Sequence, residues 1–223
     1  MSGLNVKNLN KSYVLDKTKI EVNRNISMSV PVGSSVWIYG NSGAGKSTFL
    51  NMISGIDTSD SGVIDWNGVN IERMTSGMRS SFRLNNCALI FQFFQLIKAQ
   101  SVYDNVAFPL KVQKKSKKEI DAILSPLLEY FGITSLIRKK PDSLSGGEKQ
   151  RTSIVRSLST HPKYIIADEA TASLDIENSH KVYAYLKKYI KDNDGIGIFV
   201  SHDPIIQDYV DAKYEMREGK LFC

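Results

Sequence analysis

Apolar residues in the first third of the chain follow the spacing of β-strands. Ile26, Met28 and Val30 alternate with polar residues, which is the period of a strand with one buried face. The run 36–39 is apolar throughout, as in a buried strand. The Asn-Gly pair at 67–68 follows another short apolar run and favours a hairpin turn. This part of the chain predicts a buried core strand with antiparallel strands beside it.

The pattern changes to helical spacing in the middle of the chain. The apolar residues that recur there at intervals of three and four are Ile120, Ile123, Leu124, Leu127, Leu128 and Phe131. Ser116 and Glu119 fit a capping box at the start of this helix. Pro126 lies inside the pattern, so we expect a kink or two abutting helices.

A second capping box opens another helix. Ser145 and Glu148 have the required spacing, and the His-Pro pair at 161–162 ends the helix that follows. Together the two patterns predict an α-helical subdomain over approximately residues 93–160.

The last third returns to alternating strands and helices. The runs 164–167 and 196–200 are apolar and read as buried strands. Between them, Val182, Leu186 and Tyr189 share one face of a predicted helix. We find no internal repeat or flexible linker, so all of residues 1–223 are predicted to form a single α/β domain with the helical subdomain inserted.

The sequence gives no sign of a membrane span or a secretory signal. Residues 1–30 lack a basic head followed by an apolar core. The densest apolar stretch, 88–97, is too short to cross a bilayer and contains Gln92 and Gln95. The chain is therefore expected to be free of signal and transmembrane segments.

Composition is ordinary for a globular protein, with 42% hydrophobic and 23% charged residues. Cys87 and Cys223 are far apart and form no metal-ligand spacing with histidine, which favours a reduced cytosolic compartment. The net charge is +6, partly from lysine and arginine runs at 114–118 and 138–140. Such runs are usually solvated faces, and composition does not decide between those and an anionic membrane or nucleic acid.

A glycine-rich loop lies between the predicted strand at 36–39 and a helix-like segment at 47–53. Its residues are Gly40, Asn41, Ser42, Gly43, Ala44, Gly45, Lys46 and Ser47, and Thr48 continues the helix. This is the spacing of a phosphate-binding loop, in which backbone N–H groups and a helix N-terminus face phosphate oxygens. Lys46 is placed to reach the β- and γ-phosphates, and Ser47 to ligate Mg²⁺. The segment predicts an ATP site.

Two carboxylates follow the strand at 164–167. Carboxyl ends of parallel strands are where ligands bind in open α/β folds, so Asp168 and Glu169 are expected beside the phosphate loop. Asp168 is predicted to hold Mg²⁺ indirectly. Glu169 is predicted to polarise a water for attack on the γ-phosphate.

With these motifs in place, the chain resembles the ATP-binding cassette (ABC) ATPases over essentially its whole length. The most specific match is the segment 144–151, Leu-Ser-Gly-Gly-Glu-Lys-Gln-Arg, which resembles the signature motif of that family and lies correctly between Lys46 and Asp168. The resemblance implies an α/β fold with a P-loop (RecA-like) core sheet, an antiparallel β subdomain and an inserted α-helical subdomain. It also implies ATP hydrolysis to ADP and phosphate with Mg²⁺.

The resemblance assigns further roles residue by residue. Tyr13 matches the aromatic residue that stacks on adenine, and Gln92 matches the glutamine that touches Mg²⁺ and moves with the helical subdomain. His202 matches the histidine that contacts the γ-phosphate. Asp175 belongs to a loop, 173–175, that crosses the interface of a dimer. The signature residues expected to bind nucleotide across that dimer are Ser145, Gly146, Gly147 and Glu148.

Two positions depart from the family pattern. Ala170 stands where the family usually has proline after the catalytic glutamate, which implies a looser loop but intact chemistry. Glu148 stands where the signature often has glutamine, which puts the ribose contact across the dimer in doubt.

A narrower resemblance lies in the segments 91–96 and 101–110. They are similar to the ATPases that serve lipoprotein release, macrolide efflux and cell-division permeases. This similarity implies a transmembrane permease partner, an ATP-driven head-to-tail homodimer, and peripheral attachment to the cytoplasmic face of the inner membrane. The resemblance leaves open the permease, its substrate, and export versus mechanical transmission.

Two alternative functions compete with that of a transporter ATPase. The first is an ATPase of the same superfamily that acts on DNA or in cofactor assembly. DNA binding would explain the positive charge, but the segment 48–144 is too short for the coiled coil of the DNA class and has no sustained heptads. A non-hydrolysing nucleotide-binding module is disfavoured because Glu169 and His202 are both present. We therefore expect no nucleic-acid partner.

Overall fold

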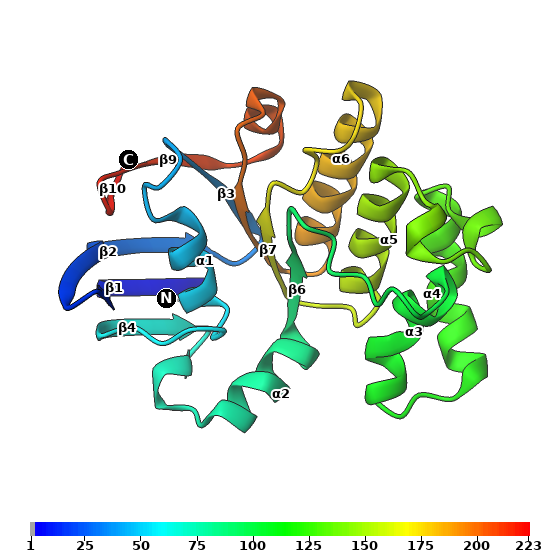
Figure 1. The fold of residues 1–223 in the computed structure, drawn as a ribbon, viewed down its shortest axis with the longest axis horizontal. Helices are drawn as coiled ribbons and strands as arrows, with labels where there is room; N and C mark the ends of the chain where they lie inside the picture. The colour runs from blue at the N-terminus through cyan, green and yellow to red at the C-terminus, as the bar shows by residue number, and fades with distance from the viewer. Residues whose placement is uncertain (1–2) are drawn as a thin grey trace.

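The computed structural model describes residues 3–223, which form two β-sheets and six α-helices (Figure 1). The strands are β1 (Gly3–Leu15), β2 (Thr18–Pro31), β3 (Ser34–Tyr39), β4 (Ser61–Trp66), β5 (Val69–Asn70), β6 (Cys87–Ile90), β7 (Tyr164–Asp168), β8 (Ile196–Val200), β9 (Ala212–Arg217) and β10 (Lys220–Phe222). The helices are α1 (Lys46–Ile53), α2 (Ser76–Asn86), α3 (Val102–Val112), α4 (Lys117–Tyr130), α5 (Gly146–Leu158) and α6 (Ile176–Asp192). The short 3₁₀ helices are Ile71–Arg73, Thr134–Leu136, Pro141–Ser143 and Pro204–Tyr209.

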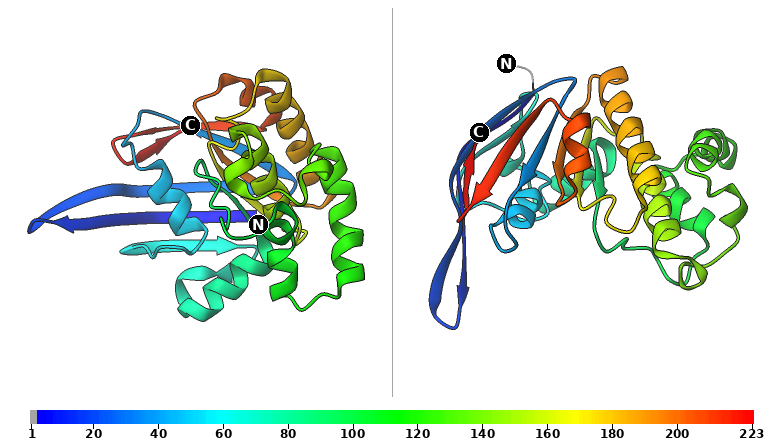
Figure 2. Two further views of the ribbon diagram at one scale, coloured as in Figure 1. Left: turned by 45° about the vertical axis from the view of Figure 1, so that its right-hand side comes forward. Right: turned by 90° about the horizontal axis from the view of Figure 1, so that it is seen from above.

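The first sheet is antiparallel, with strand order β2-β1-β4-β5. Alternation in β2 buries Ile26, Met28 and Val30, as the sequence pattern predicts. The Asn-Gly pair at 67–68 joins β4 to β5, where Trp66 pairs with Val69. The ends of β1 and β2 extend beyond the rest of this sheet as a long hairpin (Figure 2). The prediction of antiparallel strands beside a core strand is confirmed.

The second sheet has the order β10-β9-β3-β8-β7-β6. Its strands from β9 to β6 pair in parallel, and only the hairpin of β9 and β10 is antiparallel. This sheet stands in the middle of the molecule, between the antiparallel sheet with α1 on one side and helices α3 to α6 on the other (Figure 1). The α/β fold with a P-loop core sheet is thereby confirmed.

Strand β7 shows how this sheet supports two cores at once. Tyr164 and Ile166 pack with the residues of α1 and the antiparallel sheet. Ile165 and Ala167 point the other way and pack with the helices. Because both faces are covered, the strand is an uninterrupted apolar run, and burying each large side chain contributes about 1.5–3 kcal/mol.

The segment 93–160 contains α3, α4 and α5 together with two 3₁₀ turns. Both capping boxes are present: the hydroxyls of Ser116 and Ser145 accept from the third helical N–H, and Glu119 and Glu148 accept from the cap N–H groups. Helix α4 continues through Pro126 without a break, so the two-helix alternative is wrong. Proline removes one backbone bond there, and the buried apolar face of α4 outweighs that loss.

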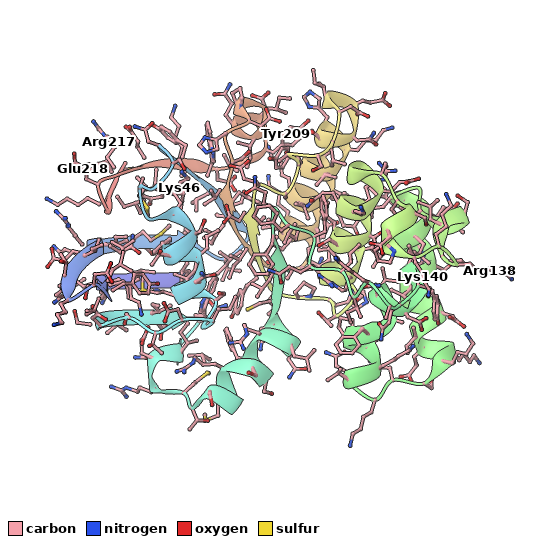
Figure 3. The ribbon with its side chains drawn as sticks, viewed as in Figure 1. Lys46, Arg138, Lys140, Tyr209, Arg217 and Glu218 are labelled. Carbon is pink, nitrogen blue, oxygen red and sulfur yellow. The ribbon has the colours of Figure 1, made fainter. Side chains whose placement is uncertain are left out.

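Three further features of the sequence can be compared with the structure: the lack of a membrane span, the basic run and the cysteines. No helix within residues 3–223 has the length and hydrophobicity that a bilayer crossing requires. The basic run 138–140 is exposed, and Figure 3 places Arg138 and Lys140 at the helical end of the molecule, far from Lys46. Cys87 is buried and Cys223 is exposed, and neither forms a disulfide within the described residues.

Candidate active site

The loop between β3 and α1 wraps closely against neighbouring backbone. Gly40 has a φ of 146°, and a Cβ atom there would collide with the carbonyl oxygen of Met216. Gly45 has a φ of 101°, and a Cβ atom would lie 2.8 Å from the carbonyl oxygen of Val22. Any L-residue would be both strained and crowded at these positions, so the glycines set the shape of the loop.

The N-terminus of α1 opens at the end of this loop. Gly45 occupies the N-cap position and supplies no side-chain cap, and the first turn carries no acidic residue. The first N–H groups of a helix have no intrahelical partner. Together with the helix dipole they form a site for an anion.

Lys46 folds back over the loop. Its ammonium donates to the carbonyl oxygens of Gly40 at 2.7 Å and Asn41 at 2.9 Å, and the residue is only 8% exposed. Burial lowers the pKa of Lys46, and the charges of Asp168 and Glu169 oppose that shift. The cation is therefore held at the loop by main-chain oxygens and lies close to two carboxylates.

The carboxyl ends of neighbouring strands supply the polar side chains opposite the loop. The Ser47 hydroxyl donates to the Asp168 carboxylate at 2.7 Å, which joins the start of α1 to the end of β7. Gln92, two residues after β6, lines the same space. A hydroxyl, a carboxylate and an amide oxygen are the hard oxygen ligands that suit Mg²⁺, which also keeps waters and phosphate oxygens. The residues present fit this ion.

Glu169 has an unusual backbone and a poorly satisfied carboxylate. Its φ is 54°, and its N–H donates to the Val200 carbonyl at 2.9 Å. Oε2 accepts from the His202 N–H at 3.3 Å, whereas Oε1 is buried with no hydrogen-bond donor among the described residues. His202 Nε2 lies 3.8 Å from Oε1, beyond hydrogen-bonding distance. Burial raises the pKa of Glu169, while the His202 N–H, the His202 charge and Lys46 oppose this and Asp168 adds to it.

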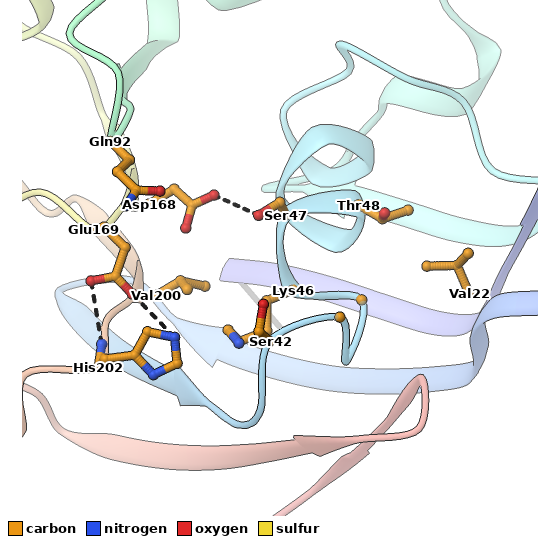
Figure 4. A pocket seen from close by; sticks show the side chains of 12 residues that line it. Val22, Ser42, Lys46, Ser47, Thr48, Gln92, Asp168, Glu169, Val200 and His202 are labelled. Atoms are coloured by element: carbon orange, nitrogen blue, oxygen red, sulfur yellow. Dashed lines mark hydrogen bonds and ion pairs between the residues drawn. The ribbon is translucent and has the colours of Figure 1, made fainter.

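A cavity of about 470 Å³ brings most of these side chains together (Figure 4). Its walls are formed by Val22, Ser42, Gly43, Gly45, Lys46, Ser47, Thr48, Gln92, Asp168, Glu169, Val200 and His202. All four residues expected to act in catalysis and all three expected to bind metal are among them. Val22 and Val200 are additional lining residues that sequence patterns do not identify, because an apolar residue in a strand carries no signal for the space it faces.

Four predicted residues lie near the cavity without lining it. Gly40 and Asn41 present their carbonyls to Lys46, and the side chain of Ala44 is buried in the core. Tyr13 is 42% exposed on β1, and its hydroxyl donates to Asp57 at 2.7 Å. Tyr13 also contacts Thr48, which does line the cavity, so its ring stands at the margin.

The signature segment is built into a different surface. None of Ser145, Gly146, Gly147 and Glu148 is among the described residues that line the cavity. Gly147 instead packs against the loop before α6, where a Cβ atom would lie 3.3 Å from the Ser173 carbonyl oxygen. Asp175 caps α6, and its carboxylate accepts from the Asn178 N–H at 2.8 Å. The structure therefore joins the signature segment to the loop 173–175 and separates both from the phosphate loop.

Comparison with known proteins gives relatives over almost the full length of the chain. The "Lipoprotein-releasing system ATP-binding protein LolD" of Wigglesworthia glossinidia brevipalpis is 36% identical over 98% of this chain and 96% of its own length. The "Putative hemin import ATP-binding protein HrtA" of Staphylococcus epidermidis is 35% identical over 98% of both chains.

A solved structure and a family model agree with these relatives. The ATP-binding cassette MJ0796, in a dimeric post-hydrolysis state bound to ADP and Pi, superposes with a TM-score of 0.93 at 27% identity, covering 98% of this chain and 96% of the other. The family model described as ABC transporter matches residues 23–172. That match spans more than half of the residues, and the chain belongs to the ABC transporter family as one of its ATPase cassettes.

Proposed function

We propose that this ABC ATPase hydrolyses Mg·ATP at the cavity beside α1 and thereby powers a separate membrane permease. The observation that carries the proposal is the Glu169 carboxylate: Glu169 lines the same cavity as Lys46 and the Ser47–Asp168 pair, and its buried Oε1 has no hydrogen-bond donor among the described residues. A buried acceptor without a donor is costly, so its presence in a polar cavity favours a role toward a water or substrate group.

The loop and α1 bind the phosphates of ATP in this proposal. The N–H groups of residues 43–48 face the phosphate oxygens, and Lys46 exchanges loop carbonyls for the β- and γ-phosphates. The exposed ring of Tyr13, beside Thr48, stacks on the adenine. This arrangement uses the three features that the nucleotide needs: amide donors, a cation and an aromatic face.

Mg²⁺ binds next to the phosphates through residues of three elements. Ser47 would ligate the ion, Asp168 would hold it through the Ser47 hydroxyl and water, and Gln92 would offer its amide oxygen. When bound, the ion neutralises the charge that develops on the phosphate oxygens.

Glu169 and His202 carry the hydrolytic step. The attacking water donates to Glu169 Oε1, which orients it and accepts its proton as the oxygen attacks the γ-phosphorus and the bond to ADP breaks. His202 contacts the γ-phosphate from the exposed side of the cavity, where 62% of its side chain is accessible. Burial of the carboxylate raises its proton affinity, which strengthens it as a base.

A second copy of the chain completes each site. The signature residues face away from the cavity of their own chain, so Ser145 and Gly147 of one copy bind the nucleotide held by Lys46 of the other. The structural relative MJ0796 is dimeric, which supports dimer formation by this chain. Asp175 and its loop lie beside Gly147 and belong to the same interface.

The permease binds next to Gln92. A cavity of about 300 Å³ extends from Gln92 past Leu50, Leu89 and Phe91 to Phe93, whose side chain is 79% exposed. Its walls combine six apolar residues with six polar ones, among them Ser47 and Asp168. Amphipathic helices bind in grooves with apolar walls, and we assign this groove to a short cytoplasmic helix of the permease. The other residues expected in this groove, Phe94, Leu96 and Ile97, are half-buried and are not among the described residues that line it.

The segment after Gln92 is tied to the helical part of the chain. Arg156 on α5 donates to the carbonyl oxygens of Gln95 at 2.7 Å and Phe94 at 3.0 Å. Closure of the dimer around ATP at Gln92 is thereby linked to α5, to the groove and to the permease helix. One relative is named for lipoprotein release, which supports a role in export or mechanical transmission. For the chain itself, peripheral attachment through the permease at the cytoplasmic face of the inner membrane is part of this proposal.

The competing function in DNA maintenance has less support. The α-helices α2, α3 and α4, which lie between Thr48 and Leu144, are 11 to 14 residues long and belong to the packed domain. A long coiled coil, which would reach DNA at a distance, has no place in this segment.

The Glu169→Gln variant tests the proposal. It keeps the shape of the side chain but removes the base, so ATP binds and is not hydrolysed, and a stable dimer accumulates on size-exclusion chromatography with Mg·ATP. Glu72→Gln is the matched control, because burial also raises the pKa of Glu72 and that residue lies outside the cavity. The proposal would be contradicted if the Glu169→Gln variant stayed monomeric with Mg·ATP or hydrolysed ATP at the parent rate.

A further inference from the structure

A cluster of buried hydroxyl groups lies behind the cavity and has no part in the chemistry above. Thr171, Tyr183 and Ser201 are 3%, 2% and 1% exposed. The Tyr183 hydroxyl lies 2.9 Å from Thr171 Oγ1 and donates to Ser201 Oγ at 3.3 Å. Buried hydroxyls are costly unless they are hydrogen-bonded, and these three satisfy that need largely through one another.

The two residues bridged by Tyr183 belong to the two loops that carry the reacting groups. Thr171 lies two residues after Glu169, and Ser201 directly precedes His202. The strands before these loops are neighbours, with Asp168 paired to Val200. Strand pairing ends at this point, so beyond it the hydroxyl of Tyr183 adds a buried side-chain link between the two loops to the bond that Glu169 Oε2 accepts from the His202 N–H.

The hydrogen bonds of the cluster form a consistent chain. The Ser201 hydroxyl oxygen accepts from the Tyr183 hydroxyl and also from the Asp203 N–H at 3.0 Å. Because the Tyr183 hydroxyl proton is donated to Ser201, the Tyr183 hydroxyl oxygen accepts the hydrogen bond from the Thr171 hydroxyl. The Ser201 carbonyl in turn accepts from the Trp37 indole at 2.9 Å. Each group has a partner, and the loop before His202 is held from several sides.

The ring of Tyr183 is fixed by its neighbours. It stacks on Tyr209 at a centroid distance of 5.8 Å and meets Phe199 edge-on at 6.4 Å. Tyr209 is itself bonded through its hydroxyl to His180 Nδ1 at 2.7 Å. The hydroxyl of Tyr183 is therefore presented at one position by a packed aromatic group.

The backbone of Glu169 needs such support. A φ of 54° is disfavoured for a residue with a side chain, and it persists only where the surroundings hold it. We propose that Tyr183 is a positioning residue whose hydroxyl fixes the Glu169 loop against the His202 loop, so that the carboxylate and the imidazole meet the γ-phosphate together. The inference rests on the roles proposed for Glu169 and His202.

Tyr183→Phe removes the hydroxyl and leaves the ring in place. Tyr189→Phe is the matched control: it changes the same helix in the same way, but the Tyr189 hydroxyl donates to the Pro162 carbonyl at 3.0 Å, away from both loops. Both variants are assayed for kcat and KM of Mg·ATP hydrolysis and for melting temperature. Since one hydrogen bond is worth about 0.5–1.5 kcal/mol, we expect kcat to fall about 2- to 10-fold for Tyr183→Phe, with KM unchanged.

The control separates positioning from general stability. Tyr189→Phe is expected to keep the parent kcat even where its melting temperature falls as much as that of Tyr183→Phe. Equal losses of kcat in the two variants, or an unchanged kcat in Tyr183→Phe, would overturn the inference while the parent remains active. If Glu169→Gln retains the parent rate in the same assay, the proposed function fails instead.

Discussion

Replacing Lys46 by alanine removes the cation that the phosphate loop holds within the cavity. In the structure this ammonium is almost fully buried and donates to the carbonyls of Gly40 and Asn41, at 2.7 and 2.9 Å. On nucleotide binding it exchanges these main-chain acceptors for charged phosphate oxygens. The variant keeps the loop glycines and α1, so the amide donors stay in place and only the charge is lost.

The size of the effect follows from that exchange. A hydrogen bond to a charged group is worth about 1.5–3 kcal/mol, and each 1.4 kcal/mol changes an equilibrium constant about tenfold. The dissociation constant for ATP should therefore rise about 10- to 100-fold in Lys46→Ala. Burial of Lys46 adds to the expected effect, since screening by water is weak there.

Calorimetric titration with a non-hydrolysable ATP analogue and Mg²⁺ measures this change directly. Lys187→Ala is the control, because the Lys187 ammonium also donates to a backbone carbonyl, that of Asp208 at 2.9 Å, but lies outside the cavity. The control should bind as the parent does. A dissociation constant for Lys46→Ala within about threefold of the parent, with a normal melting temperature, would refute the role given to Lys46.

Two further predictions concern coupling and pH. Phe93→Ser replaces the exposed apolar residue of the groove. It should leave the ATPase rate of the isolated chain unchanged and abolish its co-sedimentation with membranes that contain the permease. Full retention of membrane binding would place the groove elsewhere. Burial raises the pKa of Glu169 above its ordinary value of 4.5, and Glu169 acts as a base only when it is ionised. On acidification kcat/KM should therefore fall at a higher pH than it would for an exposed glutamate. A kcat/KM that stays constant down to pH 4.5 would contradict this.

Local patterns in the sequence predict the elements whose signals are contained within them. The capping boxes at Ser116 and Ser145 are both formed, because a cap and its partner lie three residues apart on one turn. The glycine loop and the apolar runs of β3, β7 and β8 are likewise local signals. They give the fold class and most residues of the cavity.

Other elements carry weak local signals and escape prediction. Helix α2 buries only Phe82, so it shows no apolar stripe. Helix α3 contains Pro109, a helix breaker, in its last turns. Strand β6 has only four residues, and its pairing with β7 joins Cys87 to Tyr164 across a long stretch of sequence. Such elements form because packing partners elsewhere in the chain cover them.

The sequence by itself determined several of the buried faces, the two capping boxes and the motifs that carry phosphate chemistry. Only the tertiary structure decided that Ser47 bonds to Asp168, that Val22 faces the nucleotide cavity, and that Tyr183 joins the loops of Glu169 and His202. Hydrophobic periodicity encodes the face that a residue turns to the core, but it does not encode the partner it meets there. Those partners are set by strand order and register, which depend on contacts between residues far apart in the chain.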